Sequence, residues 1–150
     1  MKEEFMNLAF FYAEKAYELD EVPIGAVIVK DDKIVSFGFN HKECNQSVLE
    51  HAELIAIREA EKQFHNWRLD DCDLYVTLDP CPMCASAIKQ ARIRNVYSAL
   101  SNTDSRNGEL LNVIFQSDST NPEVSFISNL RVDSSRKLLN SFFQKQRKNN

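Results

Sequence analysis

The sequence is poor in the residues that interrupt regular structure, with three glycines and four prolines among 150 residues. This scarcity excludes collagen-like and low-complexity chains. No apolar run approaches the roughly 18 to 20 residues that a membrane helix needs. The start, Met1-Lys2-Glu3-Glu4, lacks the cationic region and apolar core of a secretion signal. With 43% hydrophobic and 27% charged residues, the sequence predicts a single globular domain over residues 1–150, located in the cytoplasm and without a membrane partner.

Cysteine is also scarce, with one residue at each of positions 44, 72, 81 and 84. Because a cytosolic compartment keeps thiols reduced, the four cysteines are not expected to form disulfides. The four thiols are therefore expected to serve metal binding or catalysis rather than a disulfide framework.

Positive charge is concentrated at one end of the chain. The formal net charge is −4, yet the last fifteen residues carry five basic side chains and no acidic one. These are Arg136, Lys137, Lys145, Arg147 and Lys148. A basic end on an acidic body is typical of a phosphate-binding arm, although most short charge runs are solvated helix faces.

The spacing of apolar residues alternates between helical and strand periods along the whole chain. Helices are expected at residues 3–19, 54–64, 85–91 and 110–115 and in a C-terminal helix with its tail over about 133–150. Strands are expected at residues 24–29, 33–39, 74–78, 96–100 and 124–127, with a polar loop at 40–47. This order predicts an α/β fold with three α-β-α layers, in which a mixed five-stranded sheet lies between helices.

Two short motifs contain the residues best suited to chemistry: His51-Ala52-Glu53 and Pro80-Cys81-Pro82-Met83-Cys84. Two cysteines separated by two residues at a strand-to-helix junction can face one ion, and a helix N-terminus favours their thiolates. His51 supplies a third ligand. A Cys₂His zinc centre keeps its fourth position open to water, which distinguishes a catalytic from a structural zinc.

Glu53 is suited to moving the protons of such a reaction. Residues i and i+2 point nearly opposite ways in a regular helix. We therefore expect His51 and Glu53 in the first turn, with the ion between two facing helix N-termini.

Three other interpretations of the motifs remain open. The Cys-x-x-Cys pair is found in redox dithiols, although those usually have an aromatic residue and a glycine nearby. A closed structural zinc site needs a fourth ligand, for which the candidates are His41, Cys44, His65 and Cys72. Inert buried cysteines beside an exposed His-Glu pair are the third interpretation.

The combination of H-x-E and P-C-x-x-C is the signature of zinc nucleobase deaminases. The sequence resembles the bacterial tRNA-specific adenosine deaminase family over nearly its full length. The resemblance rests on residues 21–27, 38–40, 51–53, 67–69, 74–78, 80–84 and 142–143. The metal motif alone indicates the superfamily, whereas Trp67-Arg68-Leu69 and Phe142-Phe143 favour the tRNA enzymes over free-base or nucleoside deaminases.

The resemblance implies a cytidine-deaminase-like fold and hydrolytic conversion of adenosine to inosine. In that interpretation His51, Cys81 and Cys84 hold one zinc ion per chain, and Glu53 passes a proton from water to adenine N1. Asn40 contacts the base. The resemblance also implies that the base pocket is lined by Ile24, Ala52 and Leu78.

The resemblance also implies partners. The substrate is the wobble adenosine of a tRNA anticodon stem-loop, the basic C-terminal helix follows the loop phosphates, and the protein is a homodimer. Several positions depart from the family pattern. The main departure is residues 101–107, Ser-Asn-Thr-Asp-Ser-Arg-Asn, where the family typically has an Asp followed by a Lys and Gly-rich turn, so no family role in RNA binding is assigned to them. Two other functions stay open, a free-base or nucleoside deaminase and a catalytically silent RNA-binding subunit stabilised by zinc.

Overall fold

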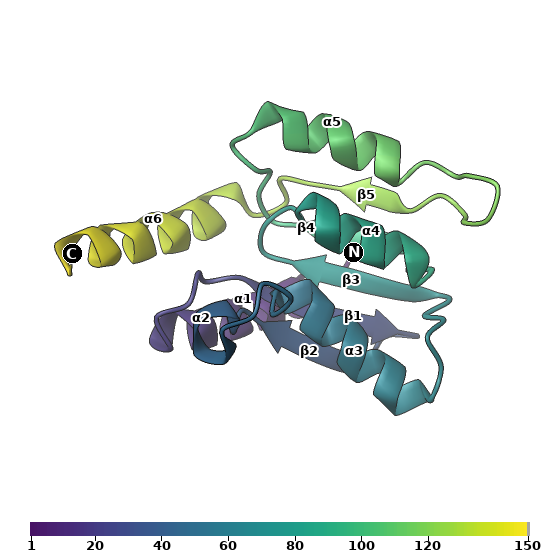
Figure 1. Ribbon diagram of the computed structural model, residues 1–150, viewed down its shortest axis with the longest axis horizontal. Helices are drawn as coiled ribbons and strands as arrows, with labels where there is room; N and C mark the ends of the chain where they lie inside the picture. The colour runs from purple at the N-terminus through teal and green to yellow at the C-terminus, as the bar shows by residue number, and fades with distance from the viewer. Residues whose placement is uncertain (150) are drawn as a thin grey trace.

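The computed structural model describes residues 1–149, which form one five-stranded sheet with helices on both faces (Figure 1). The strands are β1 (Gly25–Lys30), β2 (Lys33–Phe39), β3 (Cys72–Val76), β4 (Asn95–Ser98) and β5 (Ser125–Ile127). Their order in the sheet is β2-β1-β3-β4-β5. β1 pairs antiparallel with β2 and β3, while β3, β4 and β5 are parallel. The prediction of a mixed five-stranded sheet between helices is confirmed.

Six helices accompany the sheet among the described residues. They are α1 (Glu3–Glu18), α2 (Lys42–Asn45), α3 (Ala52–Phe64), α4 (Pro82–Gln90), α5 (Ser105–Ile114) and α6 (Val132–Lys148). In Figure 1, α3, α4 and α5 cover the near face of the sheet, α1 lies behind it, and α6 extends away from the sheet. Within residues 1–149, no helix combines the length and the apolar character that a membrane span requires.

Each face of the sheet has its own core. Alternating residues of β1 point to opposite faces, so Ala26 and Ile28 join the core under α3 and α4, and Val27 and Val29 join the core under α1. Gly25 permits the close approach of α1, because a Cβ there would lie 2.0 Å from the carbonyl oxygen of Ala9. The helices on both faces of the sheet are thus packed directly on β1.

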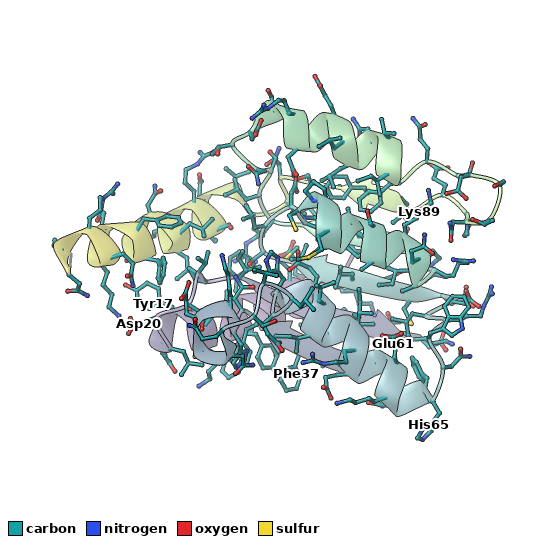
Figure 2. All side chains as sticks on the ribbon, in the orientation of Figure 1. Tyr17, Asp20, Phe37, Glu61, His65 and Lys89 are labelled. Atoms are coloured by element: carbon teal, nitrogen blue, oxygen red, sulfur yellow. The ribbon has the colours of Figure 1, made fainter. Side chains whose placement is uncertain are left out.

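The C-terminal helix is attached at its beginning and along its length. The buried Ser135 hydroxyl donates to the carbonyl of Thr77 at 2.6 Å. Farther along, Phe142 packs edge-on against Tyr17 at 6.0 Å between ring centroids, and Lys145 donates to Asp20 at 2.9 Å (Figure 2). These contacts connect α6 to the end of α1 and to the end of β3. Asn150, the last residue of the predicted basic tail, lies outside the described residues.

Several predicted boundaries were wrong. The apolar run at 74–78 predicted a strand, but the ladder of β3 is displaced toward the N-terminus and ends at Val76. Helix α5 begins at Ser105 rather than 110, because the Asp104 side chain accepts the Arg106 N–H at 3.0 Å and starts the helix. The polar loop at 40–47 contains the four-residue helix α2, which the sequence pattern did not predict.

Candidate active site

The two motifs meet where α3 and α4 begin. His51 is the N-cap residue of α3 and Cys81 is the N-cap residue of α4, with Pro82 as the first residue of that helix. Proline is favoured at this position because its fixed φ suits a helix and no N–H is lost. Cys84 follows in the first turn of α4. Two helix N-termini, with their partial positive charge, therefore face one point.

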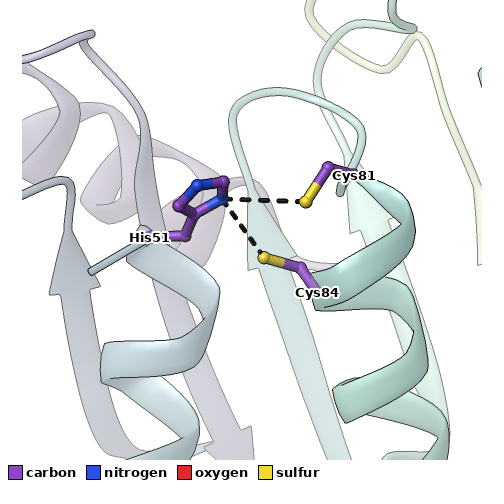
Figure 3. A group of neighbouring side chains, drawn as sticks. All are labelled: His51, Cys81 and Cys84. Carbon is purple, nitrogen blue, oxygen red and sulfur yellow. Dashed lines mark hydrogen bonds between the residues drawn. The ribbon is translucent and has the colours of Figure 1, made fainter. Parts of the chain in front are cut away.

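His51, Cys81 and Cys84 converge on one point in the structure (Figure 3). The Nδ1 atom of His51 lies 3.7 Å from the Sγ of Cys81 and 3.4 Å from the Sγ of Cys84. The three donor atoms all lie within 4.8 Å of one another. Among residues 1–149, this is the only group of three or more His, Cys, Asp or Glu side chains close enough to hold a metal ion.

The residues considered for a closed fourth position lie elsewhere. Cys72 is buried within β3, Cys44 is exposed on α2, and His65 is the C-cap residue of α3. The Nδ1 atom of His41 is hydrogen-bonded to the carbonyl of Phe39 at 2.7 Å. In the described part of the chain, the donor set is therefore three residues, as an open catalytic site requires.

The site shifts the proton affinities of its own residues. The hydrogen bond from the Cys84 thiol, with support from His51, lowers the pKa of Cys81 to about 4. The same hydrogen bond, together with burial, raises the pKa of Cys84. The hydrogen bond to Cys81 also raises the pKa of His51, against the effect of burial. Cys81 is therefore a thiolate at neutral pH, which is the form that binds a metal.

Glu53 is the second residue of α3, as the expected first-turn placement requires, and its side chain is 4% exposed. Burial raises the pKa of Glu53 to about 7, although its own backbone N–H and the nearby His51 act to lower it. A carboxyl group with a pKa near neutrality can both accept and release a proton at the pH of the cell.

Asn40 lies directly after β2 and is 8% exposed. Its Oδ1 accepts the N–H of Ala52 at 2.9 Å, which satisfies one of the free donors at the start of α3. The close packing of β2 on α3 depends on Gly38, where a Cβ would lie 2.3 Å from the Ala52 carbonyl oxygen. Asn40 is thus fixed beside the triad through its oxygen, and its Nδ2 is the group that can donate to a ligand.

The three remaining residues predicted for the base pocket have different environments. Ile24 and Leu78 are half-buried, whereas Ala52 is fully buried in the core. Leu78 lines a cavity of about 260 Å³ between the 100–103 segment and α6, together with Arg136 and Phe143. The cavity places a guanidinium and an exposed aromatic ring of α6 next to the strand end that leads to Cys81.

Sequence reasoning missed a residue that supports the site. Glu21 is 1% exposed, and its carboxylate accepts the backbone N–H groups of Glu43 at 2.9 Å and Cys44 at 2.6 Å. Burial acts to raise the pKa of Glu21, but these two donors outweigh it and lower the pKa. Glu21 therefore holds α2, which connects Asn40 to His51. The sequence signal for Glu21 was its place in the 21–27 stretch that resembles the family. The sequence did not show that Glu43 and Cys44 would donate hydrogen bonds to it.

The fold and the triad together define a class, the cytidine-deaminase-like deaminases with a His-Cys-Cys metal-binding triad. The family model described as MafB19-like deaminase matches residues 1–147. The chain is 37% identical over 147 residues to the tRNA-specific adenosine deaminase of Bacillus subtilis (strain 168), over 97% of this chain and 91% of that protein. The chain therefore belongs to the tRNA-specific adenosine deaminases, within the MafB19-like deaminase family, and the resemblance found in the sequence is confirmed.

Two solved structures extend the comparison. One comes from biochemical and structural studies of A-to-I editing by tRNA:A34 deaminases at the wobble position of transfer RNA. It matches with a TM-score of 0.83 and 36% identity, over 92% of this chain and all of that chain. The other, guanine deaminase from Bacillus subtilis, matches with a TM-score of 0.65 and 34% identity, over 85% of each chain.

Proposed function

We propose that the chain is a zinc-dependent hydrolase that converts adenosine to inosine at the wobble position of tRNA anticodon loops. The observation that carries the proposal is the convergence of His51, Cys81 and Cys84 beside the buried Glu53. It occurs in a chain that belongs to the tRNA-specific adenosine deaminases. Residues 1–150 are proposed to form a single deaminase domain.

The donor set fits zinc. Two thiol sulfurs and one imidazole nitrogen within 4.8 Å are ligands that zinc prefers, and three protein ligands are typical of its catalytic sites. We therefore assign one zinc ion per chain to His51, Cys81 and Cys84. When bound, zinc supplies the Lewis acidity that makes water a nucleophile near neutral pH. Thiolate ligands need a reducing compartment, which supports a cytoplasmic location.

Glu53 is assigned the proton transfers. Its carboxylate takes a proton from the attacking water and delivers it to adenine N1, which makes C6 more electrophilic. The hydroxide left by this transfer adds at C6. Glu53 then moves the remaining proton from the C6 hydroxyl to the exocyclic amine, the C6–N bond breaks, and adenosine and water have become inosine and ammonia. The pKa of about 7 allows the same group to act first as base and then as acid.

The base pocket is assigned to Asn40, Ile24, Ala52 and Leu78. Asn40 is already fixed by the Ala52 N–H, so its Nδ2 is oriented without a loss of entropy on binding. A donor of this kind suits an acceptor nitrogen on the purine edge. The partly buried side chains of Ile24 and Leu78 supply apolar surface for the faces of the base.

The anticodon stem-loop is assigned as the partner because an unstacked loop base is cheap to move into a pocket. Helix α6 carries the five cations of the C-terminal segment, and one of them, Arg136, lines the cavity beside Leu78. Basic side chains along a helix attract loop phosphates. We also propose a homodimer, in line with the family resemblance.

A direct assay tests the proposal. The purified protein with zinc is incubated with an anticodon stem-loop that has a wobble adenosine, and inosine is measured by mass spectrometry. The matched control is the same stem-loop with guanosine at the wobble position. We expect conversion of the first substrate alone, and absence of inosine with zinc bound would reject the proposal.

The similarity to guanine deaminase gives a second candidate, hydrolysis of a free base. The same assay includes free guanine, cytosine and cytidine, with ammonia release as the measurement. Turnover of one of these above turnover of the stem-loop would favour the second candidate. Binding of the stem-loop without release of ammonia from any substrate would indicate a silent RNA-binding subunit.

A further inference from the structure

The 101–107 segment, which differs from the family pattern, contributes a buried side chain next to the metal triad. Asn107 lies in the first turn of α5 and is 7% exposed. Its Nδ2 donates a hydrogen bond of 3.3 Å to the carbonyl oxygen of Pro80. Pro80 is also buried and directly precedes Cys81. The atypical segment is therefore connected to the peptide that leads into the Cys-x-x-Cys motif.

The Pro80 carbonyl has a particular need for an external donor. Cys81 is the N-cap residue of α4, so the carbonyl before it lies outside the helix and does not join its hydrogen-bond ladder. Pro82 has no N–H to offer. A buried carbonyl must still be hydrogen-bonded, and the amide of Asn107 meets this requirement.

Helix α5 is held firmly enough to act as a support. At its N-terminus, the Asp104 side chain accepts the Arg106 N–H, and the Asp104 carbonyl accepts the Asn107 N–H, each at 3.0 Å. At its other end, the Lys89 ammonium of α4 donates to the Ile114 carbonyl at 2.6 Å and also to the Gln116 carbonyl (Figure 2). Side-chain hydrogen bonds therefore connect the C-terminal end of α5 to α4 and its N-terminal end to Pro80, the residue before the N-cap of α4.

We propose that Asn107 is a positioning residue for Cys81, one that orients the Pro80–Cys81 peptide so that the Cys81 sulfur meets His51 and Cys84. The inference rests on the metal assignment in the proposed function. It concerns how one ligand is presented, not the transfer of protons. Hydrogen bonds of this supporting kind commonly change metal affinity by 10 to 100-fold.

The test replaces the donor without changing the size of the side chain. Asn107→Asp cannot donate from its carboxylate, and an acidic residue is well tolerated in the first turn of a helix. Asn107→Leu removes the donor without adding charge. The matched control is Arg106→Ala, in the same turn, where the side chain is 82% exposed. Zn²⁺ affinity is measured by competition with a chelator, and Co²⁺ is substituted to record the thiolate-to-metal absorption bands.

We expect both Asn107 variants to bind Zn²⁺ roughly tenfold or more weakly and to shift the cobalt bands. Arg106→Ala should match the wild type. A folded Asn107→Leu protein with unchanged affinity and an unchanged cobalt spectrum would overturn the proposal, as would an effect confined to Asn107→Asp, because the added charge would then be the cause. A wild-type protein that binds neither ion would remove the metal assignment and this inference together, whereas a wild-type protein that binds zinc but is inactive on RNA would remove only the reaction.

Discussion

Replacing Glu53 by Gln separates proton transfer from metal binding. The carboxyl group is 4% exposed and is not one of the three metal donors. Gln has nearly the same shape, so it fills the same space in the first turn of α3 and cannot exchange protons. We expect Glu53→Gln to keep its zinc and its fold and to lose almost all conversion of adenosine to inosine.

The size of the loss follows from the roles that one group performs. General acid–base catalysis contributes about 10² to 10⁴-fold, and Glu53 is proposed both to accept and to deliver a proton. We therefore expect kcat to fall by about 10³ to 10⁴-fold, equivalent to about 4 to 5.5 kcal/mol in the activation barrier. Single-turnover conversion of a wobble-adenosine stem-loop measures this, and zinc content per chain is determined on the same samples.

The same substitution has a second effect, on stability. Burial raises the pKa of Glu53 to about 7, so its contribution is fully favourable below the unfolded pKa of about 4.5 and is lost as the pH rises through 7. In chelator-treated protein at pH 8, Glu53→Gln should raise the free energy of unfolding by up to about 3 kcal/mol. At pH 4.5 the difference should nearly vanish.

Urea unfolding at the two pH values measures this second effect, with Glu59→Gln on the exposed face of α3 as a control. A zinc-loaded Glu53→Gln protein that retains inosine formation within tenfold of the wild type would refute the assigned proton transfer. Loss of stability at pH 8 would refute the account of the buried carboxyl group.

Three further outcomes are expected. Cys81→Ser should reduce the zinc content from about one ion per chain to near zero and lower the melting temperature, since metal binding and folding are linked; elemental analysis and calorimetry measure both. Asn40→Asp retains an acceptor for the Ala52 N–H but loses the amide donor to the base. Loss of one such hydrogen bond, about 1.4 to 3 kcal/mol, should lower kcat/KM by roughly 10 to 100-fold in the stem-loop assay, while the melting temperature stays near that of the wild type. Burial raises the pKa of Cys72 to about 11, so the stabilising effect of its neutral thiol is complete below pH 9 and is lost as the pH rises through 11. Between pH 8 and pH 11, the free energy of unfolding of the wild type should fall by about 2 kcal/mol relative to Cys72→Ala, measured by urea unfolding.

The sequence was informative where local rules decide the structure. The position of the Cys-x-x-Cys pair at a strand-to-helix junction and the opposite directions of residues i and i+2 predicted that Cys81 and His51 lie at helix starts, where the structure has them. The sheet was equally accessible, because the period of the apolar residues changes with each element.

The misses depend on contacts that are distant in the chain. Helix α2 has four residues and is held by Glu21, more than twenty positions earlier, so no local pattern could indicate it. The run that continues to Leu78 is apolar enough for a strand, but the pairing of β3 with β4 ends at Val76 and Ser98. The role of Asn107 also depends on a contact between residues far apart in the chain, since nothing in the sequence near Asn107 indicates its hydrogen bond to Pro80.

Different elements hold the metal donors and the cationic surface, and this bears on specificity. The donors belong to the starts of α3 and α4, whereas α6 is attached through Ser135 to the Thr77 carbonyl and through Phe142 to α1. A related guanine deaminase shares the fold, so the fold does not by itself select the substrate. We expect selection of RNA to come mainly from α6 and the cavity beside Leu78, so that changes there alter KM for the stem-loop while leaving zinc affinity unchanged.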